Sequence, residues 1–438
     1  MPLKLSNLLR PFEDFFKSQV AGGMVLIAAT ALALLLANSP LADAYHHFWE
    51  LQLFVGLPEF GLSKSLHHWI NDGLMAVFFF VVGLEIKREL LAGELASPRN
   101  AALPIAAAVG GMAVPALTYA LLVADPAQAS GWGIPMATDI AFALGIIALL
   151  GQRIPRSLAI FLTALAIVDD LGAVLVIALF YTGDLYWPAL GLAAASLAIL
   201  WAGNRAGLQS PNFYALVGFV LWLGLLKSGI HASVAGVLIG ATIPVRPRHS
   251  HDEFLERIDT LLQRYRSYET IEGPFHHESR LGTLLALEHV CHDAMSPLQR
   301  MEHVMTSWVI FGVMPIFALA NAGISLSGAE LQSALAHPVT HGVGFGLLLG
   351  KPVGILLFSW LAVRLGWADL PRGAGWYDII GVGFLAGIGF TMSLFITNLA
   401  FTDALLAAEA KVGIFSASLL AGAVGYLLLS RRERAYRS

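Results

Sequence analysis

The sequence predicts an all-α membrane protein with about twelve transmembrane helices. Apolar residues make up 57% of the 438 residues and charged residues only 13%, about half the charged share of a typical soluble protein. Apolar runs long enough to cross about 30 Å of hydrocarbon recur along the whole chain. Because a backbone inside a bilayer has to satisfy its own hydrogen bonds, runs of this length predict helices.

The apolar runs set the expected order of elements. They cover residues 20–37, 67–91, 101–123, 128–150, 157–181, 188–202, 212–227, 229–245, 303–321, 339–365, 376–399 and 404–430. We interpret residues 1–438 as a single transmembrane domain, with 246–302 as a hydrophilic insert within it. Residues 38–66 read as a polar and aromatic loop between the first two spans.

Basic residues predict the orientation of these spans. Lys and Arg concentrate on alternate loops, with Lys64 and Lys227 as exceptions. By the positive-inside rule both termini are cytoplasmic, which an even number of spans also requires. The basic residues are thus spread along one membrane face, so the partner we expect is the lipid bilayer and not nucleic acid.

Three aspartates, Asp139, Asp169 and Asp170, lie inside the apolar runs. A carboxylate at the bilayer centre costs about 2.5–3.5 kcal/mol on insertion scales. Acids in such positions face the interior of a bundle or a wet cavity, where they bind cations or relay protons. The chain is therefore expected to transport a cation or protons.

Two of the predicted spans contain helix breakers. Asp139 lies in GWGIPMATDIAFALG at 131–145, where Pro135 removes a backbone donor and glycines weaken the helix. A second Gly-rich stretch, GVGFLAGIGFTMS, covers 381–393. Either stretch alone is compatible with an ordinary kinked span. Two interrupted spans in corresponding halves of a chain indicate the binding site of a transporter.

Asp169 and Asp170 are adjacent in the run 157–181. Neighbouring helix positions differ by about 100°, so one side chain can face a cavity squarely while the other faces its flank. Such a pair can hold protons as one coupled unit, or release them and offer oxygen ligands to a small hard cation such as Na⁺ or Li⁺.

Other charged residues allow more than one interpretation. Lys351 lies within a span, so it needs either a partner, for which the aspartates are candidates, or a path for its amine to the interface. Glu85, at the end of the run 67–91, can belong to a site or form salt bridges with Lys87 or Arg88. His231 can act as a proton-linked switch or as a hydrogen-bonded interfacial residue.

The histidines and the single cysteine of the insert predict no resident metal or other cofactor. His276, His277, His289, Cys291 and His292 are the candidates, and their spacing matches no common zinc pattern.

Six blocks carry a resemblance to the NhaA family of bacterial sodium–proton antiporters. They are VGLEIKREL at 82–90, MATDIAF at 136–142, IVDDLG at 167–172, KSGIHA at 227–232, PIFALANAG at 315–323 and GKPVG at 350–354. The resemblance implies twelve helices with two inverted three-helix repeats, an arrangement for which this family is a known example. It also implies that the fourth and eleventh helices are interrupted and cross.

The resemblance further implies roles for nine residues. Asp169 and Asp170 would bind Na⁺ and carry protons. Thr138 and Asp139 would line the helix crossing, and Lys351 would compensate charge there or carry a proton. Candidates for the pH response are Glu85, His231, Glu302 and His303.

The implied function is electrogenic, pH-dependent export of Na⁺, and of Li⁺, in exchange for external H⁺ across a bacterial inner membrane. No enzyme activity or cofactor is implied, and the 38–66 loop offers a contact for a homodimer. A sodium-coupled solute symporter on a related fold is the alternative, and it would need a second pocket for an organic substrate. An intramembrane aspartyl protease would need a Gly-x-Gly-Asp block, which the sequence lacks.

Overall fold

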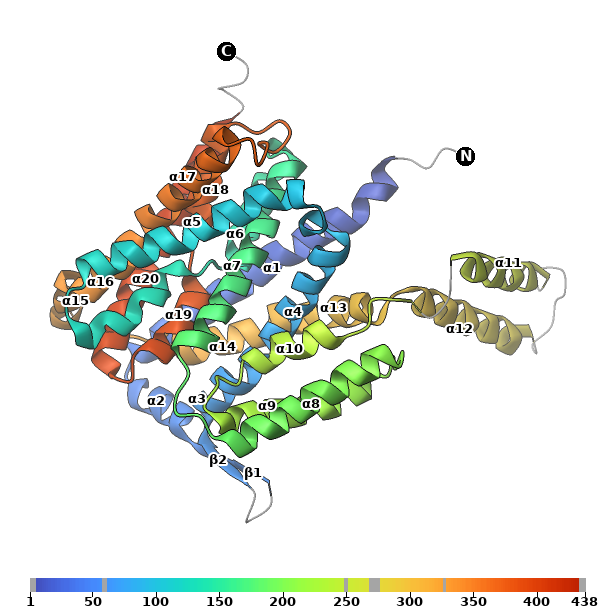
Figure 1. Cartoon of the computed structure of the whole chain (residues 1–438), viewed down its shortest axis with the longest axis horizontal. Coiled ribbons are helices and arrows are strands. Elements are labelled where there is room, and N and C mark those ends of the chain that lie inside the picture. The colour runs from blue at the N-terminus through green and yellow to red at the C-terminus, as the bar shows by residue number, and fades with distance from the viewer. Residues whose placement is uncertain (1–4, 57–60, 248–250, 268–275, 326–327, 433–438) are drawn as a thin grey trace.

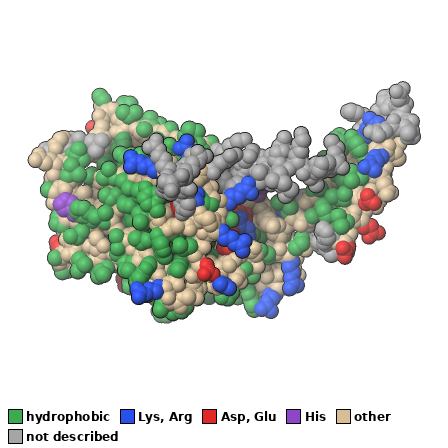
Figure 2. All heavy atoms as spheres, turned by 90° about the horizontal axis from the view of Figure 1, so that it is seen from above, with side chains coloured by type: hydrophobic (Ala, Val, Ile, Leu, Met, Phe, Trp, Pro, Cys, Tyr) green, Lys and Arg blue, Asp and Glu red, His purple; other side chains and the backbone are tan. Residues whose placement is uncertain are grey.

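The computed structural model describes residues 5–56, 61–247, 251–267, 276–325 and 328–432. Long helices pack into one bundle, and a helical hairpin stands away from it (Figure 1). Hydrophobic side chains cover much of the bundle surface, whereas Lys and Arg gather where the bundle meets the helical hairpin (Figure 2).

Within the described residues, ten helices are long and apolar enough to cross a membrane, and one bent pair adds an eleventh span. The prediction of an all-α membrane fold is therefore confirmed. The spans are Val20–Ala37 in α1 (Leu5–Ala37), Leu66–Ala92 (α3, Leu66–His68, and α4, Met75–Ala92), Pro98–Leu122 (α5), Pro126–Leu150 (ending in α6, Ile140–Leu150), Arg156–Phe180 (α7), Trp187–Arg205 (α8), Pro211–Ser228 (α9), Pro297–Asn321 (α13, Pro297–Trp308, and α14, Met314–Asn321), Pro338–Arg364 (α16, Pro338–Phe345, and α17, Lys351–Arg364), the bent pair α18 (Trp376–Ala386) and α19 (Phe390–Ala400), and Ala404–Ser430 (α20).

The span expected over 229–245 is shorter than predicted. Its helix, α10 (Val234–Thr242), has nine residues and is about 13 Å long, which is less than half the hydrocarbon thickness. Gly229 ends α9 with φ of 91°, where glycine has no steric penalty. α10 packs directly on α4, since a Cβ on Gly240 would lie 2.9 Å from the backbone of Gly83.

The described residues within 38–66 form regular structure over much of their length, although the sequence suggested a loop. They contain α2 (Ala42–Glu50) and an antiparallel hairpin of β1 (Gln52–Val55) and β2 (Leu62–Ser65), in which Leu53 pairs with Lys64. The β hairpin lies on the side of the bundle opposite to the start of α1 and the end of α20 (Figure 1).

The predicted insert contains two helices, α11 (His251–Ser267) and α12 (His276–Ala294). They pack on each other outside the bundle (Figure 1). The next span begins inside the predicted insert, because Ser296 and Gln299 form a capping box at the start of α13. Glu302 and His303 thus belong to α13. Cys291 is exposed, and the side chains of His276, His277 and His292 lie outside the described residues.

Two units of the same make-up form the centre of the bundle. In each unit an intact span is followed by a broken span and then by a second intact span. The first unit is α5, the broken span 126–150 and α7. The second unit is α16–α17, the broken span α18–α19 and α20. α5 and α17 approach closely, because a Cβ on Gly354 would collide with the carbonyl oxygen of Gly110. A π-helical turn at Gly346–Gly350 immediately precedes Lys351; such turns are frequent at functional sites.

Candidate functional site

The two broken spans meet at their breaks. In the first, tight 3₁₀ turns over Pro126–Met136 are followed by extended backbone at Ala137 and Asp139. Thr138 Oγ1 donates to the carbonyl of Ala386 at 2.9 Å, and the Asp139 amide donates to the carbonyl of Ile388 at 2.6 Å. Each break thus satisfies polar backbone groups of the other, as interrupted helices inside a membrane protein require.

Asp139 binds the amino-terminal ends of two half-helices. Its Oδ1 accepts from the Phe142 amide at 3.3 Å and caps α6. Its Oδ2 accepts from the amide of Thr391 at 3.0 Å and from the Thr391 hydroxyl at 2.5 Å. One carboxylate therefore faces the partial positive charge of both α6 and α19. Thr391 was not among the predicted site residues, although its place two residues after Gly389 in the Gly-rich stretch was a signal.

Lys351 forms an ion pair with Asp169. Its Nζ lies 2.7 Å from Asp169 Oδ2, and the two side chains are 0% and 1% exposed. The same amine donates to the carbonyl of Met136, where the first broken span loses its helical turns. A positive charge at the carboxyl end of a helical segment is stabilising. Lys351 therefore does not reach the interface, and its partner is Asp169 and not Asp139.

The two acids in the middle of α7 are incompletely paired. Asp169 Oδ1 is buried without a hydrogen-bond partner, although Thr138 lies next to this carboxyl group. Asp170 is 3% exposed and forms no hydrogen bond or ion pair with a described residue. It lies within electrostatic range of Asp169, Glu85 and Asp139. Buried carboxylate oxygens without partners require a proton or a cation to compensate them.

A second group of charges connects α4 and α13. Arg88 binds Glu302 and also Glu89, the latter at 3.1 Å. Glu85 is half-buried on the same helix and lies within electrostatic range of Glu302 and of Asp170. The salt-bridge alternative thus applies to Glu89, which pairs with Arg88. Lys87 instead donates to the carbonyls of Ala241 and Ile243 at the carboxyl end of α10.

The structure separates the four residues expected in the pH response. Glu85 and Glu302 share the charged group on α4 and α13, whereas the side chain of His303 is exposed. His231 precedes α10, 3.5 Å from Asp72 and 2.8 Å from the Ser233 hydroxyl. Its ring packs against Phe395 of α19, with a centroid distance of 5.4 Å.

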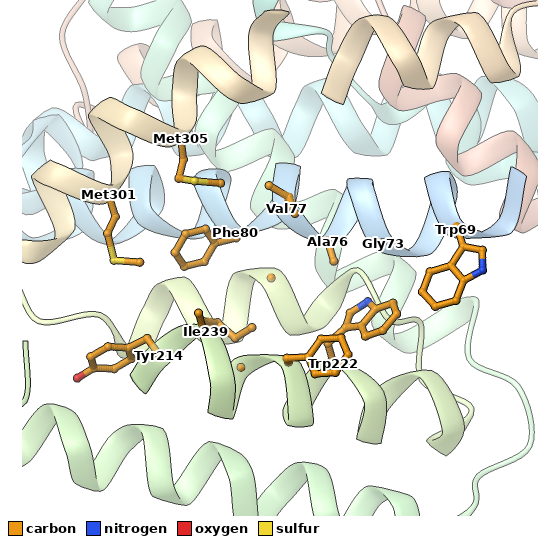
Figure 3. A pocket seen from close by; sticks show the side chains of 14 residues that line it. Trp69, Gly73, Ala76, Val77, Phe80, Tyr214, Trp222, Ile239, Met301 and Met305 are labelled. Atoms are coloured by element: carbon orange, nitrogen blue, oxygen red, sulfur yellow. The ribbon is translucent and has the colours of Figure 1, made fainter. Parts of the chain in front are cut away.

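Two cavities lined by described residues lie away from these acids. One of about 440 Å³ opens between α4, α9, α10 and α13 (Figure 3). Its lining is apolar and includes Trp69, Phe80, Trp222 and Met305. Another of about 390 Å³ lies near the β hairpin and α9. A symporter would need a second pocket with polar groups next to Asp169 and Asp170. Neither of these two cavities is lined by those acids.

Comparison with known proteins gives one consistent family. The family model described as Na+/H+ antiporter 1 matches residues 13–429. The chain is 64% identical over 431 residues to Na(+)/H(+) antiporter NhaA 2 of Syntrophotalea carbinolica, with 98% of each chain covered. It is 51% identical over 430 residues to the NhaA antiporter of Acidithiobacillus ferrooxidans, again with 98% of each covered. The NhaA antiporter of Koribacter versatilis is 49% identical over 431 residues, which cover 98% of this chain and 93% of the relative.

Proposed function

This chain belongs to the Na+/H+ antiporter 1 family, and from that premise we propose that it exports Na⁺ in exchange for external H⁺ at Asp169 and Asp170. The observation that carries the proposal is the incomplete pairing of these two buried acids. Protons and a small cation can each compensate the same carboxylates, so the two compete for one site. Competition of this kind suffices for exchange if the site faces only one side of the membrane at a time.

The ion pair of Lys351 constrains how a cation binds. The amine occupies Asp169 Oδ2 at 2.7 Å, so a cation that both acids coordinate has to share this oxygen or displace the amine. Lys351 then either stays charged beside the site and compensates the acids, or its amine is displaced from Asp169 and itself carries one of the exchanged protons. Two acids and one lysine can carry more than one proton for each Na⁺, which would make the exchange electrogenic. Li⁺ is a hard cation of the same charge and is an expected second substrate.

The charged group on α4 and α13 supports a pH-dependent rate. Glu85 lies between this group and the ion site, within electrostatic range of both Glu302 and Asp170. A change of protonation at Glu302 alters the field at Glu85, and a change at Glu85 alters the field at Asp170. Activation at alkaline cytoplasmic pH would let the protein contribute to Na⁺ and pH homeostasis.

The family and the number of apolar helices indicate a multi-pass protein of the inner membrane. For its orientation, we infer from the basic loops that both termini and the α11–α12 insert are cytoplasmic. Because this orientation needs an even number of crossings, the segment 229–245 with the short helix α10 is the twelfth crossing beside the eleven long spans. The β hairpin then lies outside, where every residue of β1 is exposed. An exposed strand edge can pair with another strand, so this hairpin is the expected contact of a homodimer.

Proton flux in everted membrane vesicles tests the proposed function. Addition of NaCl or LiCl to vesicles that hold a pH gradient should release protons, whereas KCl should not. Asp169→Asn and Asp170→Asn should each abolish the response. Asp369→Asn is the matched control, because this carboxylate is exposed and pairs with Arg99 at the surface. Full exchange in both site variants would contradict the assignment, and Na⁺ uptake without proton movement would favour symport.

A further inference from the structure

One face of α19 contacts α4 and α14 beyond the ion site. Thr391, Phe395 and Asn398 are spaced by four and three residues, so their side chains lie along the same stripe of the helix. Thr391 binds Asp139 at the helix crossing. Phe395 and Asn398 lie further along α19, toward the end of the bundle that carries the β hairpin.

Phe395 takes part in a layer of aromatic rings. Its ring centroid lies 5.5 Å from that of Phe79 on α4 and 6.3 Å from that of Phe317 on α14. His231 contacts the same ring from the start of α10. Phe79, Phe317 and Phe395 are all 0% exposed. Two spans, α4 and α14, and the segment before α10 therefore pack on one phenyl ring of α19.

A layer of amides lies one turn beyond the rings. Asn398 Nδ2 donates to Asn321 Oδ1 at 2.6 Å, and Asn321 Nδ2 donates to Asn71 Oδ1 at 2.9 Å. His67 Nε2 also contacts Asn321 Oδ1, at 2.9 Å. Asn321 is 1% exposed and lies one turn after Phe317 on α14. Asn71 belongs to a π-helical turn, Trp69–Leu74, that precedes α4.

We propose that these two layers are the outer gate of the transporter, formed by Phe79, Phe317 and Phe395 with Asn71, Asn321, Asn398 and His67. The proposal rests on the antiport function and the orientation inferred above. All of the amide residues lie at the ends of their spans that face outside in this orientation. In the structure the three phenyl rings are 0% exposed and Asn321 is 1% exposed, which corresponds to a closed gate.

Opening of the gate requires α19 to move relative to α4 and α14. The contacts that break are one amide hydrogen bond, Asn398 to Asn321, and the packing of one ring, Phe395. A single neutral hydrogen bond and a single aromatic contact are each weak interactions. These contacts are strong enough to hold a closed state and weak enough to break in each cycle. Because Thr391 lies on the same stripe, the movement also changes the contact with Asp139.

A reversible cross-link across the gate tests this proposal. Cys291 is the single cysteine, so Cys291→Ser provides a cysteine-free background. To it we would add Asn321→Cys and Asn398→Cys, and join the thiols by oxidation or with a short bifunctional thiol reagent. Na⁺-driven proton flux in everted vesicles should fall at least tenfold on cross-linking and return after reduction. Purified cross-linked protein should still bind Na⁺ in a calorimetric titration.

The matched control is an exposed pair of residues outside the gate. Arg99→Cys and Asp369→Cys in the same background replace two residues that form a surface ion pair at 2.9 Å, and cross-linking of this pair should leave the flux unchanged. Flux that survives a complete Asn321–Asn398 cross-link would overturn the gate. Absence of flux already in Cys291→Ser would instead refute antiport itself.

Thiol labelling supplies a second readout that needs only one variant in the gate. In Cys291→Ser, Asn398→Cys should react with a membrane-impermeant reagent from the outer face at least threefold faster when Na⁺ drives turnover. Equal labelling with and without Na⁺ would contradict the proposal.

Discussion

Replacement of Lys351 by methionine should destabilise the protein strongly. Lys351→Met keeps most of the length of the side chain but removes the amine that binds Asp169 at 2.7 Å. Because the two side chains are 0% and 1% exposed, water cannot replace the lost partner. Removal of one member of a buried ion pair costs about 3–5 kcal/mol. At about 1.4 kcal/mol for each factor of ten, the unfolding equilibrium shifts by two to nearly four orders of magnitude.

Unfolding in mixed detergent micelles, titrated with a denaturing detergent at pH 8, measures this change. An unpaired carboxylate can take up a proton instead, so the same measurement at pH 5 should show a smaller loss. The double variant Lys351→Met with Asp169→Asn contains no lone charge and should recover at least half of the lost stability. The reasoning fails if Lys351→Met is as stable as the wild type at pH 8, or if the double variant is no more stable than the single one.

Two other contacts give predictions that the same unfolding assay can check. Thr391→Val removes the hydroxyl that donates to Asp139 at 2.5 Å and should cost about 1.5–3 kcal/mol, the usual range for a hydrogen bond to a charged group. Thr391→Ser keeps the hydroxyl and is its control; equal losses in the two variants would show that the hydrogen bond is unimportant. Gly236→Ala places a Cβ against the carbonyl oxygen of Ala76, so α10 has to move away from α4 at about 1–3 kcal/mol. Gly191→Ala, with no atom within 4 Å of the new Cβ, should not destabilise the protein, and an equal loss there would contradict the packing argument.

Hydropathy predicted most of the spans nearly to the residue. The runs 20–37 and 404–430 coincide with the helical spans of the structure, because a span has to match the bilayer in length and composition, and both are local properties. The run 229–245 predicted a full-length transmembrane helix for the same reason, and the predicted length was wrong. It is apolar enough to cross the membrane, but its helix has only nine residues, because residues 229–233 form the turn from α9. The helix itself, α10, packs along α4.

Regular structure outside the membrane was harder to predict. The β hairpin of residues 52–65 has no clear alternation of polar and apolar residues, and all of β1 is exposed. Pairing between its strands, and not burial of one face, determines this element. The start of α13 was assigned to the insert because its first turns are polar, and the capping box at Ser296 marks the true boundary.

The sequence by itself determined that Asp139, Asp169, Asp170 and Lys351 need partners, because an ionisable side chain inside an apolar run is costly wherever the chain places it. Only the tertiary structure decided which partners these are. Lys351 pairs with Asp169, 182 residues away in the chain, and Asp139 binds Thr391, 252 residues away. The amide layer of Asn71, Asn321 and Asn398 likewise joins three distant spans. Such pairings depend on how helices cross and which faces meet, and no local pattern of residues records that.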